Sequence, residues 1–248
     1  MPSPCADLIR LGRDNDGGYL VSRADVMATE CLIGLGVNDD WSFEAQFSKT
    51  KSCSVICYDA SVGARKFLML YLRGLENKLP SSVTRKRART LIGYLWFFRG
   101  RREHVRRFVA KSPDRKTVTF SHVAERIGSR SAFLKMDIEG AEYGLLDDIV
   151  AIAPQLSGLV IEFHRCHEKL DQVQRFVDRI GLTLVHVHIN NCGVGGQGGI
   201  PAILEMTFSS LTPAGHKPVG QFAPHPLDQP NSSERPDIAL HFDSPADA

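Results

Sequence analysis

The chain has 248 residues, of which 43% are apolar, which suits one large α/β domain better than two full domains. No run approaches the roughly 18 uninterrupted apolar residues of a membrane span, and the first residues lack the apolar core of a signal peptide, so we expect a cytoplasmic protein. The six cysteines are scattered and form no Cys-x-x-Cys pair, which indicates reduced thiols and argues against a structural zinc site.

The net charge of +2 hides an uneven distribution. Residues 65–107 hold 13 Lys or Arg and only two acids, whereas the rest of the chain has 17 basic and 26 acidic residues. A basic segment on an acidic body favours an anionic partner for that segment.

Residues 8–22 read as two short extended pieces around a tight turn. Asp16-Gly17-Gly18 supplies the positive φ that a hairpin turn needs. On local chemistry alone this is an ordinary hairpin.

Residues 30–36 form a compact apolar strand that ends in Gly34-Leu-Gly36, and an amphipathic helix begins near Trp41. A strand, a Gly-x-Gly turn and a helix are typical of a nucleotide-cofactor loop, because glycines let the backbone approach the ligand. Asp39 stands where a dinucleotide-binding loop has its third glycine. An acid repels a pyrophosphate but can pair with a cationic amino-acid tail, which favours S-adenosylmethionine over NAD. Asp39 or Asp40 can also cap the helix.

A second strand, residues 54–59, ends in Asp59. An acid at this place in doubly wound folds typically accepts hydrogen bonds from the ribose hydroxyls. The alternative is that Asp59 simply caps the following segment.

Residues 63–107 form a basic insert in which two apolar blocks, 67–72 and 91–98, alternate with basic clusters. Both blocks look helical, with Pro80 and Ser81 between them. Basic clusters beside aromatic residues suit an anionic acceptor or an anionic membrane surface. The alternative is a lid whose apolar side packs on the body. No recognised nucleic-acid-binding motif is present.

The central strand, residues 132–138, carries Asp137 and Glu139 to its end, and Gly140 breaks it before a helical pattern that runs to Ile152. Open α/β sheets bind ligands at the carboxyl ends of their strands, which makes both acids candidate site residues. The alternative is a pair of solvated acids at a helix start. The next buried strand, 158–164, has Glu162 and His164 at its end, and a helix follows over 168–180.

Two alternating strands, 182–191 and 202–208, follow, joined by the glycine-rich segment 193–199. With no crossover helix between them, these strands must pair antiparallel. His186 and His188 point to one face. A His-x-His pair can bind metal, but a strand histidine is more often a hydrogen-bonded core or edge residue.

The stretch Lys135-Met-Asp-Ile-Glu-Gly-Ala-Glu142 resembles the signature of the FkbM-like family of S-adenosylmethionine-dependent class I methyltransferases. The resemblance implies a Rossmann-like, doubly wound, mostly parallel sheet with a C-terminal antiparallel strand pair. The resemblance covers roughly residues 8–210, and the basic insert departs from the simplest family pattern. We expect one methyltransferase domain over 1–248, within which 63–107 is an insert or lid. The cofactor-binding residues that we expect are Asp16, Gly17, Gly34, Gly36, Asp39, Asp59 and Asp137. Asp137 and Glu139 would border the methyl-transfer site.

We therefore predict a methyltransferase that uses S-adenosyl-L-methionine, and by resemblance favour O-methylation of a hydroxylated small molecule or glycan. A general base helps such a transfer. The candidates are Asp137, Glu139, His164 and His188, and no metal is assigned. Two alternatives are a metal-dependent hydrolase built on those same four residues, and a non-catalytic module that binds anionic surfaces.

Overall fold

A computed structural model describes residues 1–192, 200–212 and 222–241. The glycine-rich segment 193–199 and the prolines Pro213 and Pro218 lie outside the described residues. Among the described helices, none has the length and apolar character needed to cross a membrane.

The chain begins with the predicted hairpin. Strand β1 (Leu8–Gly12) pairs antiparallel with β2 (Gly18–Ser22), from Leu8 opposite Ser22 to Gly12 opposite Gly18. A short helix that the sequence pattern did not indicate, α1 (Arg23–Ala28), follows, and the Ser22 hydroxyl caps it. The hairpin lies against the main sheet, where the Thr207 hydroxyl donates to the Leu20 carbonyl at 2.6 Å.

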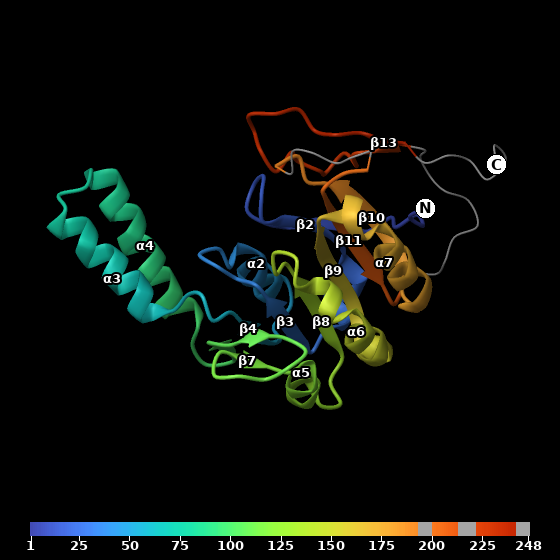
Figure 1. Cartoon of the computed structure of the whole chain (residues 1–248), viewed down its shortest axis with the longest axis horizontal. Coiled ribbons are helices and arrows are strands. Elements are labelled where there is room, and N and C mark those ends of the chain that lie inside the picture. Colours follow the sequence, from blue (N-terminus) through green and yellow to red (C-terminus); the bar gives the residue numbers. More distant parts are fainter. Residues whose placement is uncertain (193–199, 213–221, 242–248) are drawn as a thin grey trace.

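A seven-stranded sheet forms the centre of the molecule, in the order β5-β4-β3-β8-β9-β11-β10 (Figure 1). Neighbouring strands from β5 to β9 are parallel, and β11 runs antiparallel to both β9 and β10. This topology confirms the predicted fold class, including the antiparallel C-terminal pair. The strands are β3 (Cys31–Leu35), β4 (Ser54–Tyr58), β5 (Arg102–Val105), β8 (Ala132–Met136), β9 (Leu156–His164), β10 (Thr183–Ile189) and β11 (Ile203–Ser209).

Hydrophobic cores cover both faces of the sheet. Alternation along β8 turns Leu134 and Met136 to one face, where they pack with α5, α6 and α7, and Phe133 to the other, where it meets α2 and the hairpin. This arrangement explains why the central strands read as continuous apolar runs. The covering helices are α2 (Ser42–Thr50), α5 (Phe120–Ile127), α6 (Leu146–Ile152) and α7 (Cys166–Arg179), with short 3-10 turns η1 (Glu142–Gly144) and η2 (Ala153–Gln155).

The basic insert contains two helices, α3 (Ala64–Glu76) and α4 (Ser81–Phe97), on either side of Pro80 as predicted. Its expected C-terminal end is different, because residues 102–105 form β5 at the edge of the main sheet. They form a hairpin that projects away from the sheet (Figure 1). Its base is attached through Phe67 and Tyr94, which pack with Trp41 of the body. Two short strands, β6 (Phe108–Val109) and β7 (Thr117–Val118), connect the insert to α5.

The described C-terminal segment crosses the outer edge of the sheet at β10. The His186 side chain contacts Asp228 at 3.1 Å and that of His188 contacts Asp237 at 3.0 Å, so both strand histidines hold this segment to the sheet. At the end of the described residues, β13 (Leu240–His241) pairs antiparallel with β12 (Phe222–Ala223).

Candidate active site

A pocket of about 720 Å³ lies at the carboxyl ends of the parallel strands, where an open α/β sheet binds its ligands. Its floor comes from the residues that follow β3, β4 and β8, and from the last residues of β9. Residues of the β1–β2 turn and of the start of α2 line its wall.

Gly36, just after β3, brings the strand ends together. Its φ is +78°, and a Cβ at this position would lie 1.7 Å from the Asp137 carbonyl oxygen. Its N–H donates to the Tyr58 carbonyl at 3.1 Å. Only glycine fits a positive φ and so close a backbone approach, so this turn depends on Gly36.

Gly34 serves a different purpose. It lies within β3, where a Cβ would be 2.8 Å from Glu44 Oε1, so its missing side chain makes room for that carboxylate. Glu44 is 1% exposed, and its Oε1 has no hydrogen-bond partner among the described residues. Burial raises the pKa of Glu44. Glu44 therefore brings a buried carboxylate to the wall of the pocket.

Asp59 ties the turn after β3 to the end of β4. Its Oδ2 accepts the N–H groups of Val37 at 3.1 Å and Asn38 at 2.8 Å, and its Oδ1 accepts that of Ser61 at 2.6 Å. Burial would raise the pKa of Asp59, but the hydrogen bonds from Ser61, Asn38 and Val37 lower it overall. The ionised carboxylate therefore shapes the loop, and it keeps lone pairs for a ligand hydroxyl.

Lys135 is a buried cation beneath the pocket. Its Nζ donates to the Gly36 carbonyl at 2.8 Å and lies 3.8 Å from Asp137 Oδ2. Burial would lower the pKa of Lys135, but the charges of Asp137, Glu44 and Glu162 raise it. The side chain therefore connects the glycine turn to the acid that follows β8.

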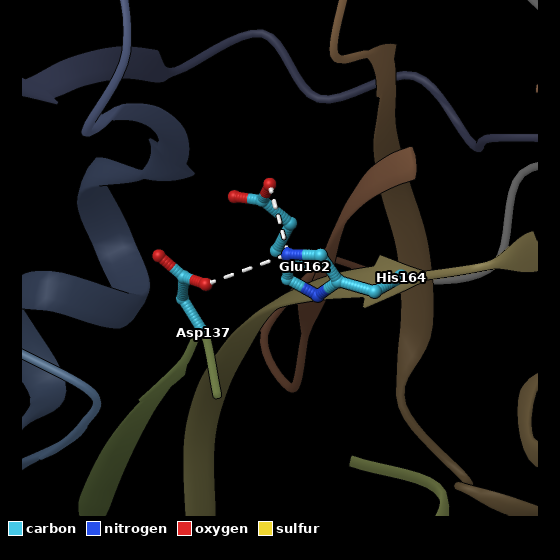
Figure 2. A group of neighbouring side chains, drawn as sticks. All are labelled: Asp137, Glu162 and His164. Atoms are coloured by element: carbon cyan, nitrogen blue, oxygen red, sulfur yellow. Dashed lines mark ion pairs between the residues drawn. The ribbon is translucent and has the colours of Figure 1, made fainter. Parts of the chain in front are cut away.

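His164 is surrounded by carboxylates. Its Nε2 lies 3.9 Å from Asp137 Oδ1, 3.7 Å from Glu162 Oε1 and 3.5 Å from Glu139 Oε2, and Figure 2 shows the first two groups turned toward it. On the other side of the ring, Nδ1 lies 2.5 Å from Oε1 of the fully buried Glu142. Burial would lower the pKa of His164, but the hydrogen bond to Glu142 and the nearby carboxylates raise it to about 9.

Glu162 points from β9 to the same side as His164, because the two are separated by one residue. The Tyr19 hydroxyl donates to Glu162 Oε2 at 3.1 Å, and the Asn190 amide donates to Oε1 at 2.9 Å. Burial, followed by the charges of Asp137 and Glu205, raises the pKa of Glu162 well above its ordinary value. The β1–β2 hairpin and the end of β10 thus orient this carboxylate.

Three of the five described non-glycine residues with positive φ follow these strand ends. Asn38, Glu139 and Arg165 adopt φ values of +47°, +56° and +54°, shortly after β3, β8 and β9. Positive φ in non-glycine residues is uncommon and often marks a functional site.

The match to a protein family identifies the activity of the chain. The model described as "Methyltransferase FkbM domain" matches residues 60–193, which is more than half of the chain. The chain belongs to the FkbM methyltransferase family. It is therefore an S-adenosylmethionine-dependent methyltransferase, as predicted. Gly36 and Asp59 precede the matched range, so the match does not cover the expected cofactor loop.

Solved structures resemble the FkbM-family chain at low sequence identity. The FkbM methyltransferase of Methylobacillus flagellatus KT is 16% identical, with 72% of this chain and 44% of that chain covered and a TM-score of 0.39. A putative tRNA (m1A22) methyltransferase of Streptococcus pneumoniae, solved with S-adenosyl-L-methionine, is 9% identical, with coverages of 80% and 72% and a TM-score of 0.42. The fibrillarin pre-rRNA processing protein of Methanococcus jannaschii is 8% identical, with coverages of 75% and 68% and a TM-score of 0.41. Among curated proteins, no sequence matches the chain.

Most of the expected site residues line the pocket of this FkbM-family enzyme. They are Asp16, Gly17, Gly36, Asp39, Asp59, Asp137, Glu139 and His164. Gly34 lies behind the pocket, against Glu44. Asp40, the other expected cap, accepts the Ser42 N–H at 3.0 Å at the start of α2.

His188 does not join the others. It is 3% exposed and lies between Glu205 at 3.2 Å and Asp237 at 3.0 Å, outside the pocket lining. The C-terminal segment covers the face of β10 that carries it. The base role expected for His188 is therefore not supported by its position.

The pocket lining also includes residues that the sequence did not indicate as site residues, among them Tyr19, Glu44, Lys135, Glu162 and Asn190. Lys135 and Glu162 had one available signal, since each is a charged residue inside an apolar strand. The others come from elements far apart in the chain.

A second hollow, of about 810 Å³, lies at the opposite edge of the sheet, beside the starts of β8 and β9. No carboxylate and no histidine is among its lining residues, which include Arg130, Arg179 and several serines. It offers no acid-base chemistry for methyl transfer.

Proposed function

We propose that this FkbM-family enzyme transfers a methyl group from S-adenosylmethionine to a hydroxyl group of a small molecule or glycan. The observation that carries the proposal is a single pocket that combines the glycine turn at Gly36 with the strand-end cluster of Asp137, Glu139 and His164. Cofactor loop and acid-base groups thus face the same space, as a transfer between two bound molecules needs.

The pocket suits the cofactor in three places. The turn at Gly36 lets the backbone approach the ligand, and Asp59 retains acceptor capacity for the ribose hydroxyls. Glu44 and Asp39 supply carboxylates for the ammonium group of the methionine tail. Burying a carboxylate is costly, and the positive charge of a cofactor ammonium beside Glu44 would offset part of that cost.

The reaction that we propose is an in-line displacement at the methyl carbon. The acceptor oxygen forms a C–O bond as the S–CH₃ bond breaks, and the electron pair of that bond stays on sulfur, giving S-adenosylhomocysteine. The hydroxyl proton passes to one of the two carboxylates at the strand end, Asp137 or Glu139, while His164 lies beside both of them. The protein contributes orientation and exclusion of water in addition to this proton acceptor.

An anionic group on the acceptor fits the surroundings of the pocket. Lys66 lines the pocket and also an adjoining hollow of about 390 Å³. That hollow is otherwise lined by Arg65, Met69, Leu70, Arg73 and Arg106. Four cations at one wall favour a phosphate or carboxylate beside the hydroxyl that is methylated.

The hairpin of α3 and α4 supports contact with an anionic membrane surface. Leu68, Leu72 and Leu75 are between 44% and 50% exposed along one flank of α3, and Ile92, Leu95 and Trp96 are between 55% and 65% exposed on α4. With Phe67, Gly74 and Tyr94 buried, helical periodicity brings both sets to the same side of the hairpin. Exposed apolar side chains among Lys and Arg are typical of helices that lie in a lipid interface.

The proposed activity is tested by supplying methyl-labelled S-adenosylmethionine with hydroxylated acceptors in matched pairs, with and without a phosphate or carboxylate group. Mass spectrometry of the products should reveal a methyl ether, formed faster from the anionic member of a pair. A label transferred to nitrogen or carbon, or hydrolysis of the acceptor without transfer, would contradict the proposal.

A further inference from the structure

The side chains of Asp137, Glu162 and His164 form a group that suits a metal ion. One oxygen or nitrogen from each lies within 4.8 Å of the others. Asp137 follows β8, whereas Glu162 and His164 share one side of β9, so the three converge from two neighbouring strands of a rigid sheet (Figure 2). We propose that these three side chains bind one divalent cation in the cofactor pocket.

The distances fit an ion between the groups better than direct contact. His164 Nε2 lies 3.9 Å from Asp137 Oδ1 and 3.7 Å from Glu162 Oε1. Direct hydrogen bonds would bring these atoms to about 2.7–3.2 Å. Two ligands at bonds of about 2.0–2.2 Å to one ion are separated by roughly 3–4 Å, depending on the angle between them. Small movements of the side chains would therefore complete the site.

The groups around the triad have the arrangement expected behind metal ligands. Glu142 Oε1 lies 2.5 Å from His164 Nδ1, which fixes the ring and leaves Nε2 without a hydrogen bond among the described residues. Metal-binding histidines almost always donate their other ring N–H to a carboxylate, a backbone carbonyl or water. Tyr19 and Asn190 hold Glu162 in the same way.

An independent observation is the surplus of negative charge. The carboxylates of Asp137, Glu139, Glu142 and Glu162 surround His164. Among the described lysines and arginines, Lys135 alone has its charged group within 4 Å of one of these carboxylates, that of Asp137. Glu142 is fully buried, and its Oε2 has no partner among the described residues. Buried carboxylates are costly unless they are paired or coordinate a metal, and a divalent ion supplies the missing charge.

Two carboxylate oxygens and one imidazole nitrogen suit a first-row divalent ion such as Mn²⁺. Three protein ligands leave positions open for an acceptor hydroxyl, whose pKa a bound cation lowers. The proton would pass to Glu139, which is 85% exposed and 3.5 Å from His164 Nε2, and then to solvent. The ion is neither oxidised nor reduced. This catalytic role depends on the proposed methyl transfer, whereas the metal site itself does not.

The test is titration of the metal-free protein with Mn²⁺ alone, followed by calorimetry and by electron paramagnetic resonance. One saturable site is expected, and Asp137→Asn or Glu162→Gln should weaken it by about tenfold or more. His164→Asn should do the same, because an Asn amide can still donate to Glu142 but offers no second nitrogen. The matched control is Asp147→Asn, an acid on α6 that is 77% exposed, which should leave binding unchanged. Circular dichroism establishes that each variant is folded.

The inference is overturned if Mn²⁺ shows no saturable site, or if the site survives Asp137→Asn and Glu162→Gln unchanged. A second outcome would also overturn it: the metal-free protein binds no Mn²⁺, and Glu162→Gln weakens the binding of S-adenosylmethionine more than the binding of S-adenosylhomocysteine. The carboxylates would then stabilise the positive charge of the sulfonium group. S-adenosylhomocysteine is titrated separately, in the presence of a chelator. Failure of that titration counts against the cofactor pocket, whereas failure of the Mn²⁺ titration counts against the metal site alone.

Discussion

Gly36 and Asp137 lie so close that a single added methyl group on Gly36 would overlap the carbonyl oxygen of Asp137, at 1.7 Å. The two residues follow adjacent parallel strands, β3 and β8. Their contact joins the glycine turn after β3 to an acid that lines the pocket, so the shape of one fixes the position of the other.

Gly36→Ala should therefore damage both stability and cofactor binding. A positive φ in a residue with a Cβ costs roughly 1–2 kcal/mol, and relief of the clash must move one of the strand ends. We expect a lower free energy of unfolding in urea and a loss of S-adenosylhomocysteine binding in calorimetry. The matched control is Gly144→Ala, since a Cβ there would meet no atom within 4 Å. Equal behaviour of the two variants would show that the close approach does not matter.

Asp59→Ala should weaken S-adenosylhomocysteine binding by about 1–3 kcal/mol, because N–H groups of the loop and hydroxyls of the ligand would lose their acceptor. Asp59→Asn should lose less, since one oxygen remains to accept the Val37 and Asn38 N–H groups. Calorimetry on both variants provides the measurement. Full affinity in Asp59→Ala would remove this residue from the cofactor site.

Glu139→Gln should reduce turnover by about a hundredfold or more if the carboxylate accepts the proton of the acceptor. Its side chain is 85% exposed, so the free energy of unfolding should change by no more than about 0.5 kcal/mol. Asp137→Asn should likewise lower turnover by far more than it alters folding. Methyl transfer is followed with labelled cofactor, and Glu125→Gln, an exposed acid on α5, is the control. Matching losses of stability and activity would identify the acids as structural.

His188 should make the stability of the fold depend on pH. Burial would lower its pKa, but Glu205, Asp228 and Asp237 raise it from 6.5 to about 9. Because the folded pKa exceeds the unfolded one, this stabilisation is fully present below about pH 6.5 and is lost as pH rises through about 9. The full shift corresponds to at most about 3 kcal/mol.

Urea unfolding of the wild type and of His188→Gln between about pH 6 and about pH 10 measures this contribution. The pKa of His164 is also about 9, so the wild-type curve contains both histidines and the difference between the curves isolates His188. The difference should shrink as pH rises. A difference that is constant with pH would mean that the charge on His188 has no role in stability.

Removing positive charges from the α3–α4 hairpin should weaken the binding of the protein to anionic vesicles. Arg85, Lys86 and Arg89 are the residues to replace by Gln, since Arg87 donates to the Leu70 carbonyl at 2.7 Å and holds α4 to α3. Each cation near an anionic surface contributes about 1 kcal/mol, so the triple variant should bind roughly a hundredfold more weakly. The loss should diminish as salt shortens the Debye length below about 8 Å.

The control for the hairpin replaces three exposed cations elsewhere, Arg23, Lys49 and Arg175, by Gln. A second variant, in which Ile92, Leu95 and Trp96 become Ser, tests the apolar contribution. Cosedimentation with vesicles is the measurement, and cofactor affinity should stay the same throughout. If all variants bind vesicles equally, the hairpin does not contact lipid.

The strands of the sheet and the helices of the insert could be predicted because each produces a pattern within a short stretch of sequence. The run that ends at Met136 is apolar because helices cover both faces of β8, and Pro80 separates two helices whose apolar positions recur in the sequence. The six-residue α1 was missed because it is too short to show a periodic pattern.

The composition of the pocket was only partly predictable. Strand-end residues such as Asp59 and Asp137 could be found, since the ends of parallel strands meet at one edge. Tyr19 meets Glu162 across 143 residues of sequence, and no local pattern reports such a contact. The alternation of side chains along a strand predicted the face of β10 on which His188 lies. It could not predict that the C-terminal segment covers that face.

The central claim is that the pocket between β3, β4 and β8 binds the methyl donor. Calorimetric titration of the wild-type protein with S-adenosylhomocysteine, and separately with NAD, tests it most directly. We predict saturable one-to-one binding of S-adenosylhomocysteine, a raised melting temperature, and a marked loss of affinity in Gly36→Ala. No response to NAD is expected, because Asp39 occupies the place of the third glycine in a pyrophosphate loop. Stabilisation by NAD with no binding of S-adenosylhomocysteine would contradict the claim.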